Sequence, residues 1–200
     1  MRTFTITEPW LNSPVDEAIS RLPSLEIAAD IGANAGDWSD SLSSVFRHVV
    51  AVEPDWRASG LIPQHPNVHV IPAAVSDHDG VAKLYMRATT GHNSLLEVHP
   101  IGGGGMAPVP VVNVVEVPCI TLDSLLPKGA NFIKIDIEGA EVAAIRGCQD
   151  LPRWKGTVFL VECHDTFSGV EQELARLGKR VIRIPHPLHA HPGHCWAIGE

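Results

Sequence analysis

One stretch of ten residues constrains the fold of this chain more than any other. It reads Ile-Ala-Ala-Asp-Ile-Gly-Ala-Asn-Ala-Gly and covers residues 27–36. It begins apolar, as a buried strand does, and ends in small and polar residues, as a tight turn does; residues 39–46 can continue as a helix. A strand, a glycine-containing turn and a helix form the corner that binds phosphates or nucleosides in α/β folds, because small residues let a ligand approach the backbone.

The pattern of this turn excludes the common dinucleotide fingerprint. G-x-G-x-x-G starting at Gly32 would need glycines where Asn34 and Asp37 stand. What remains is D-x-G-x-N-x-G, in which Asp30 precedes the first glycine by two residues and Gly36 ends the motif. A carboxylate at this place would repel a pyrophosphate and attract a ligand with a cationic end.

Composition argues for a globular protein without a nucleic-acid partner. The chain has 200 residues, which suffices for one domain with a substantial core. Its 15 Lys and Arg against 23 Asp and Glu give a net charge of −8 with neutral histidines. Proteins that bind nucleic acids usually carry a basic face, for which Lys179, Arg180 and Arg183 are the best local candidates here.

The sequence also predicts a cytoplasmic location. The first ten residues hold no apolar region of the signal-peptide kind, and no apolar run approaches the ~20 residues of a membrane-spanning helix. The four cysteines form no C-x-x-C pair, so buried free thiols in a reducing compartment are expected at Cys119, Cys148, Cys163 and Cys195.

Local signals predict one α/β domain over residues 1–200. Residues 1–24 form a helical segment in this prediction: Ser13 caps a helix, Pro14 takes its first position, and the helix stops before Pro23. The predicted core strands cover residues 25–31, 48–52, 67–71, 131–137 and 157–163, with helices at 140–146 and 170–177. A last pair, 181–184 and 195–198, has too short a connection for a helical crossover, so it is antiparallel. The expected sheet is therefore mostly parallel, with one reversed strand.

Residues 80–121 interrupt this alternation. Residues 80–87 alternate like a half-buried strand and residues 111–120 form a second such stretch, so a β-hairpin insertion is expected. Between them, residues 88–110 include four glycines at 102–105. A loop of this length is either functional or disordered, and we expect a mobile lid over the site.

Several acids stand where such a fold binds its ligand, at the carboxyl ends of the strands. Glu53 ends the second strand, 21 positions after Gly32, and an acid about 20 residues after the first turn can accept hydrogen bonds from both ribose hydroxyls. The alternative is a solvated acid at a strand end. Ser76 and Asp77 follow the third strand and either contact a base edge or form a turn.

The fourth and fifth strands end in further candidates. Asp136 lies in an apolar run, where a charge needs a partner or a task, and Lys134 is its possible partner. Glu138 and Glu141 are either functional or placed only for the helix macrodipole. Glu162 and His164 crowd the end of the fifth strand, where His164 is either structural or catalytic.

The tail carries four histidines, which invite a metal interpretation: His186, His189, His191 and His194. Pro185, Pro187 and Pro192 between them make a turn equally natural. No Cys, Asp or Glu joins these histidines at a typical zinc spacing, so no physiological metal is expected.

At this point the chain resembles the FkbM family of S-adenosylmethionine-dependent methyltransferases. The matching pieces are Asp30-Ile31-Gly32-Ala33-Asn34-Ala35-Gly36, Val52-Glu53-Pro54, Ala74-Val75-Ser76-Asp77 with Gly80, Asn93-Ser94-Leu95, Val117 with Thr121-Leu122-Asp123, Ile133-Lys134-Ile135-Asp136-Ile137-Glu138-Gly139-Ala140-Glu141 with Arg146-Gly147, and Val161-Glu162-Cys163-His164. K-x-D-x-E-G-x-E together with D-I-G-A-N-x-G is specific. The resemblance implies a Rossmann-like class I methyltransferase fold, with seven strands and the last one antiparallel. It also implies O-methylation of a hydroxyl on a small molecule, sugar, glycolipid or secondary metabolite.

The motifs, the fold and the chemistry of the side chains together suggest a role for each candidate. Bound S-adenosylmethionine is expected to meet Asp30, Gly32, Ala33, Asn34, Gly36, Glu53, Ser76 and Asp77. The acceptor is expected to meet His92, Asn93, Ser94 and Glu138. His164, with an unperturbed pKa near ~6.5, is expected to be mostly neutral and to act as the base, with Glu162 or Asp136 orienting it or the acceptor. Asp136 is the alternative base.

Three other functions stay open at this point, and the net acidity disfavours one of them, a nucleic-acid methyltransferase. A nicotinamide-dependent oxidoreductase could use a similar sheet, although the failed fingerprint argues against it. A non-catalytic nucleoside-binding module could keep the turn without turnover.

Overall fold

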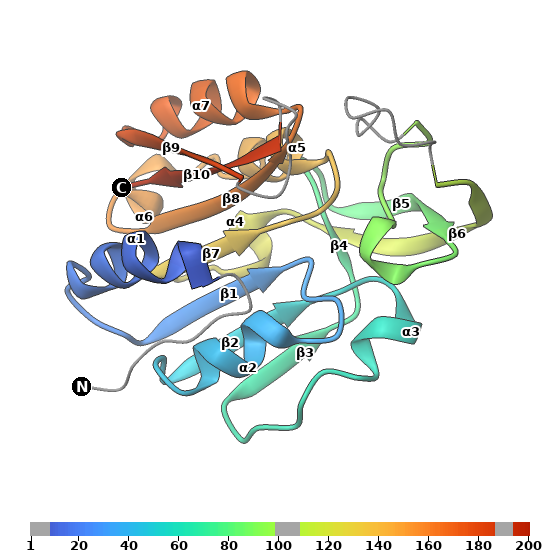
Figure 1. Cartoon of the computed structure of the whole chain (residues 1–200), viewed down its shortest axis with the longest axis horizontal. Coiled ribbons are helices and arrows are strands. Elements are labelled where there is room, and N and C mark those ends of the chain that lie inside the picture. Colours follow the sequence, from blue (N-terminus) through green and yellow to red (C-terminus); the bar gives the residue numbers. More distant parts are fainter. Residues whose placement is uncertain (1–8, 99–108, 187–193) are drawn as a thin grey trace.

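A seven-stranded sheet forms the centre of the molecule (Figure 1). The computed structural model describes residues 9–98, 109–186 and 194–200. The strands lie in the order β3 (Val68–Ile71), β2 (His48–Val52), β1 (Ile27–Ile31), β7 (Phe132–Ile135), β8 (Val158–His164), β10 (His194–Gly199) and β9 (Val181–Pro185). Neighbouring strands are parallel, except that β10 runs antiparallel to both β8 and β9. The predicted mostly parallel sheet with one reversed strand is confirmed.

Helices cover both faces of this sheet. They are α1 (Pro9–Ser20), α2 (Asp37–Ser43), α3 (Trp56–Ser59), α4 (Leu122–Leu125), α5 (Glu141–Arg146), α6 (Leu151–Trp154) and α7 (Phe167–Arg176), with a 3₁₀ turn η1 (Thr90–His92). Successive residues of β1 point to opposite faces. Ala28 packs in one core cluster with Leu11 of α1 and Leu42 of α2, and Ala29 packs in the other with Leu174 of α7. Parallel strands buried on both faces explain the apolar runs of the sequence.

The first helix begins earlier than predicted. It starts at Pro9, and Pro14 lies inside it, so the predicted cap at Ser13 is wrong. Leu11 and Val15, four residues apart, are both fully buried in the same core cluster. The helix extends toward its N-terminus because burial of Leu11 outweighs the local capping signal.

Two strand ends differ from the prediction in a way that matters for the site. β7 ends at Ile135, so Asp136 is the first residue of the loop that follows. β8 continues through His164, which places that ring at the carboxyl end of the strand. Both side chains therefore lie at the edge of the sheet where ligands bind in α/β folds.

The predicted hairpin insertion is part of a second, smaller sheet. β5 (Gly80–Arg87) pairs antiparallel with β6 (Val111–Ile120), and the short β4 (Ala74–Val75), which was not predicted, pairs parallel with β6. Figure 1 shows this sheet beside the carboxyl ends of the central strands. The Gly102–Gly105 part of the predicted lid lies outside the described residues.

Two expectations from composition can be compared with the structure. All four cysteines are buried and free, as predicted. In the part of the chain that the structure describes, none of the helices has both the length and the apolar character that crossing a bilayer requires.

Candidate active site

A cavity opens between the carboxyl ends of β1, β2 and β7 and the smaller sheet. Its empty volume is about 620 Å³. Asn34 and Glu53 line the cavity after β1 and β2, Asp136 and Glu138 line it after β7, and apolar side chains such as Val75 of β4 contribute to its wall. The arrangement can accept a ligand with an apolar middle and polar ends.

The turn after β1 cannot hold larger residues at its two glycines. Gly32 has φ +77°, and a Cβ there would lie 1.8 Å from the carbonyl oxygen of Asp136. Gly36, with φ +94°, caps α2, and a Cβ there would lie 2.8 Å from Cδ of Pro63. Ala33 is buried beside the turn and does not line the cavity. The motif therefore shapes the backbone, and only some of its side chains face the cavity.

Glu53 lies in the cavity wall, where backbone groups fix its orientation. Its Oε2 accepts a hydrogen bond from the N–H of Asn34 at 2.9 Å, and its Oε1 accepts one from the N–H of Asp55 at 2.8 Å. Burial raises the pKa of Glu53, and the two N–H groups oppose this change. Each carboxylate oxygen keeps a lone pair for a hydroxyl donor.

Asp30 lies beneath the turn, away from the predicted position beside a ligand's cationic end. It is fully buried and does not line the cavity. Ser39 donates its hydroxyl to Asp30 at 2.6 Å, and the ammonium of Lys134 is 3.2 Å away. A contact between Asp30 and a ligand stays a prediction. Lys134 links Asp30 to Asp136, which does line the cavity.

Lys134 joins the two carboxylates and the turn. Its Nζ donates to the carbonyl of Gly32 at 2.9 Å and lies 3.4 Å from Oδ2 of Asp136, as the sequence spacing allowed. Burial disfavours the charged ammonium, but Asp30 and Asp136 outweigh it, so the pKa of Lys134 is raised. For Asp136, burial is likewise outweighed by Lys134 and His164, and its pKa is lowered.

Ser76 and Asp77 lie outside the cavity. Ser76 is buried, and its backbone N–H donates to Ile120 at 3.2 Å, whereas Asp77 is exposed and pairs with His78 at 3.0 Å. Val75, the preceding residue, lines the cavity instead. Their predicted contact with a base edge stays a prediction, and this geometry agrees better with the turn interpretation.

The segment after β5 covers the cavity and is tied to the strand ends. Thr90 donates to Oδ1 of Asn34 at 2.9 Å, and Ser94 donates to the carbonyl of Glu138 at 2.7 Å. Asn93 donates to Asp55 at 2.6 Å. Asn93 and Ser94 line the cavity, as an acceptor-binding role requires.

Two polar residues near this segment complete the description. His92 does not line the cavity, and its Nδ1 is 3.9 Å from Oε1 of Glu138. Arg87 was not a candidate, but its buried guanidinium donates to the carbonyls of Tyr85, His92, Leu96, Glu97 and Val109. It thereby holds the covering segment in place.

His164 lies among three carboxylates. Its Nδ1 donates to Oε1 of Glu141 at 2.9 Å, and its Nε2 lies 3.6 Å from Oε2 of Glu138 and 3.8 Å from Oδ1 of Asp136. Burial disfavours the charged ring, but Glu141, Glu138 and Asp136 outweigh it, so the pKa of His164 is raised well above its usual value. The expectation of a mostly neutral His164 is therefore not supported, and the ring does not line the cavity.

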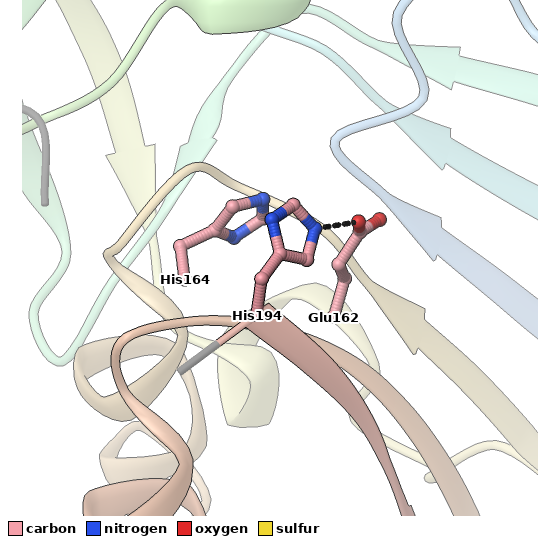
Figure 2. Close-up of side chains that lie close together, drawn as sticks. All are labelled: Glu162, His164 and His194. Carbon is pink, nitrogen blue, oxygen red and sulfur yellow. Dashed lines mark hydrogen bonds and ion pairs between the residues drawn. The ribbon is translucent and has the colours of Figure 1, made fainter. Parts of the chain in front are cut away.

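Glu162 and His194 form a second pair beside this ring (Figure 2). His194 Nε2 is 2.6 Å from Glu162 Oε1, and the ring centroids of His194 and His164 are 5.1 Å apart. Burial raises the pKa of Glu162, and the charge of Asp136 adds to this effect. The sequence argument that no carboxylate accompanies the tail histidines is wrong. Glu162 and His194 are 32 residues apart in the sequence, but the antiparallel pairing of β8 with β10 brings them together.

Of the other three tail histidines, the structure describes only His186. The ring centroid of His186 lies 4.8 Å from that of His194. His189 and His191 lie outside the described residues. Among described residues, two overlapping sets could hold a metal ion: Glu162, His164 and His194, or Asp136, Glu138 and His164, with ligand atoms in each set within 4.8 Å of one another.

The sequence pattern and the fold are both similar to those of known methyltransferases. The sequence model of the methyltransferase FkbM domain matches residues 30–181, more than half of the chain. The solved structure of methyltransferase FkbM from Methylobacillus flagellatus KT has a TM-score of 0.60 and 13% sequence identity, and the match covers 100% of this chain and 48% of that one. The chain thus spans about half the length of that protein. A search of curated proteins found no match.

Two further solved structures match over nearly their full length. An rRNA methylase from Streptococcus thermophilus has a TM-score of 0.55 at 12% identity, with 98% of this chain and 99% of that chain covered. A methyltransferase from Streptococcus mutans in complex with SAH has a TM-score of 0.51 at 10% identity, with the same coverage. Likenesses at such low identity establish the class I methyltransferase fold and nothing finer.

Proposed function

The chain belongs to the FkbM methyltransferase family, and from this premise we propose that it transfers a methyl group from S-adenosylmethionine to a hydroxyl of a small molecule, a sugar or a secondary metabolite. The observation that carries the proposal is the distribution of carboxylates along one cavity. Glu53 follows β2, and Asp136 and Glu138 follow β7, so they line the cavity on opposite sides of β1.

The residues present fit such a cofactor. Glu53 keeps one lone pair on each oxygen for the two ribose hydroxyls, because Asn34 and Asp55 donate to the other lone pairs. The apolar wall that includes Val75 suits the flat face of an adenine. Asp136 and Glu138 lie on the other side of β1, where the sulfonium and the acceptor hydroxyl would meet. When bound, S-adenosylmethionine supplies a methyl group on a sulfonium, whose in-line displacement depends mainly on placement of the acceptor.

In this proposal Asp136, and not His164, is the residue that contacts the acceptor hydroxyl. Asp136 lines the cavity, and its lowered pKa keeps it ionised and able to orient an acceptor hydroxyl. His164 lies behind it, with Nε2 3.8 Å from Oδ1 of Asp136. We therefore assign His164 the positioning of Asp136 and Glu138, and not direct acceptance of the proton.

Calorimetry with S-adenosylhomocysteine tests the proposal. Wild-type protein is expected to bind it, and Glu53→Ala is expected to weaken binding by roughly 1–3 kcal/mol through loss of charged hydrogen bonds. Glu171→Ala, a change of an exposed acid on α7, is the matched control and is expected to bind as the wild type does. Absence of heat and of any thermal shift with wild-type protein would overturn the methyltransferase assignment.

A further inference from the structure

The side chains around His164 are arranged as ligands of a cation, beyond what methyl transfer alone requires. We propose that Asp136, Glu138 and His164 bind one hard divalent cation, Mg²⁺ or Mn²⁺, at the acceptor end of the cavity. The role of this ion in holding the acceptor hydroxyl rests on the proposed function, but its binding can be measured without any methyl transfer.

The distances suit one coordination sphere. Nε2 of His164 lies 3.6 Å from Oε2 of Glu138 and 3.8 Å from Oδ1 of Asp136. An octahedral ion with ligands at about 2.1 Å has neighbouring ligand atoms about 3 Å apart and opposite ones about 4.2 Å apart. These two separations lie between those values, and all three ligand atoms lie within 4.8 Å of one another. Small side-chain adjustments, with release of the proton on Nε2, would bring them onto one ion.

The partner of the other ring nitrogen supports this assignment independently. His164 donates from Nδ1 to Oε1 of Glu141 at 2.9 Å. Glu141 is itself fully buried, and it also accepts from Thr166 at 2.8 Å and from the N–H of Gly139 at 2.8 Å. A carboxylate that fixes one imidazole nitrogen and directs the other toward a shared centre is the usual environment of a metal-binding histidine.

The structure favours this set over the neighbouring one. Glu162 and His194 already bind each other at 2.6 Å (Figure 2). Neither of them lines the cavity. Asp136 and Glu138 do line it, so an ion held by them would meet an incoming acceptor. Two carboxylates and one imidazole are also a harder donor set than two imidazoles and one carboxylate, which favours Mg²⁺ or Mn²⁺ over zinc.

The ion would make the acceptor hydroxyl more acidic, which the described cavity residues do not do. A carboxylate such as that of Asp136 is a weak base toward a hydroxyl proton. A divalent cation that binds the acceptor oxygen makes its proton more acidic, so the proton can pass to water. In the transfer, the oxygen–carbon bond forms while the sulfur–carbon bond breaks, and the sulfonium becomes a neutral thioether.

Manganese binding to the full chain, freed of metals by chelation, tests the site. Electron paramagnetic resonance is expected to show one bound Mn²⁺ per chain, with a nitrogen coupling that His164→Gln removes. Asp136→Asn and His164→Gln are each expected to weaken binding by at least about 10-fold. Glu162→Gln is expected to weaken binding less than either of these variants, because Glu162 is a neighbour of the ligand set and not a member of it. The control Glu171→Gln is expected to change binding by less than about twofold.

Three outcomes would overturn the proposal. They are no Mn²⁺ binding by wild-type protein, equal binding by wild type and Asp136→Asn, and loss of binding in Glu162→Gln with retention in Asp136→Asn, which would assign the neighbouring set. Asp136 is partly exposed, so its variant is expected to fold, and circular dichroism checks this. Calorimetry with S-adenosylhomocysteine on the same metal-free protein separates the two proposals: cofactor binding without Mn²⁺ binding overturns only the cation site, and Mn²⁺ binding without cofactor binding overturns only the methyltransferase assignment.

Discussion

The two ends of the cavity are built by different means. At the end that contains Glu53, backbone groups determine the geometry. Gly32 allows the turn, and the N–H groups of Asn34 and Asp55 orient the carboxylate. At the other end, titratable side chains from β7, β8, α5 and the loops supply the contacts, and all of them are buried or partly buried. The first end therefore depends on backbone geometry, and the second on electrostatic balance.

The largest effect is expected where backbone geometry is broken. In Gly32→Ala, the new Cβ would lie 1.8 Å from the carbonyl oxygen of Asp136, and neither backbone can move easily. We expect the free energy of unfolding to fall by about 4 kcal/mol or more, as measured by urea denaturation. Gly178→Ala is the matched control, because Gly178 has φ +76° but open space around its Cβ position. Its expected cost is only about 1–2 kcal/mol. Equal costs would show that the clash does not matter.

This contrast also explains what the sequence could reveal. The turn, Glu53 and the strand order follow from contiguous motifs and spacings, so they were predictable. Glu141 and His194 were not, because their roles depend on contacts across strands, such as the pairing of His194 with His164. The raised pKa of His164 was not predictable for the same reason, since a sequence does not show which carboxylates surround a ring.

The next prediction tests the electrostatic end through catalysis. Once an acceptor is found, His164→Ala is expected to lower kcat by roughly 10²-fold, because Asp136 and Glu138 lose the group that holds them in place. Affinity for S-adenosylhomocysteine should change little, since His164 does not line the cavity. Asp136→Asn is the comparison: if it loses the rate while His164→Ala keeps it, the positioning role of His164 is wrong.

Lys134 connects the two ends, and its removal is expected to cost about 3 kcal/mol of unfolding free energy. Lys134→Met leaves Asp30 buried beside an apolar side chain and removes the hydrogen bond to the carbonyl of Gly32. The double variant Asp30→Asn/Lys134→Met removes both charges and should recover part of this loss. If the double variant loses as much unfolding free energy as the two single variants together, then Asp30 and Lys134 do not interact, and the ion pair does not link the two ends of the cavity.

The smallest expected effect is a pH dependence confined to the electrostatic end. The folded-state pKa of His164 is raised because its carboxylate partners outweigh burial, so the folded protein retains a proton that the unfolded chain releases near pH ~6.5. The stabilisation is therefore fully present below about pH 6.5 and is lost as the pH rises toward the folded-state pKa, with a slope of at most about 1.4 kcal/mol per pH unit. Urea denaturation with a chelator present, in wild type and His164→Gln, measures this as a difference between two pH profiles. The difference should shrink with rising pH; a difference that is constant or grows would mean that His164 is neutral in the folded protein and that the acceptor end carries less charge than the geometry indicates.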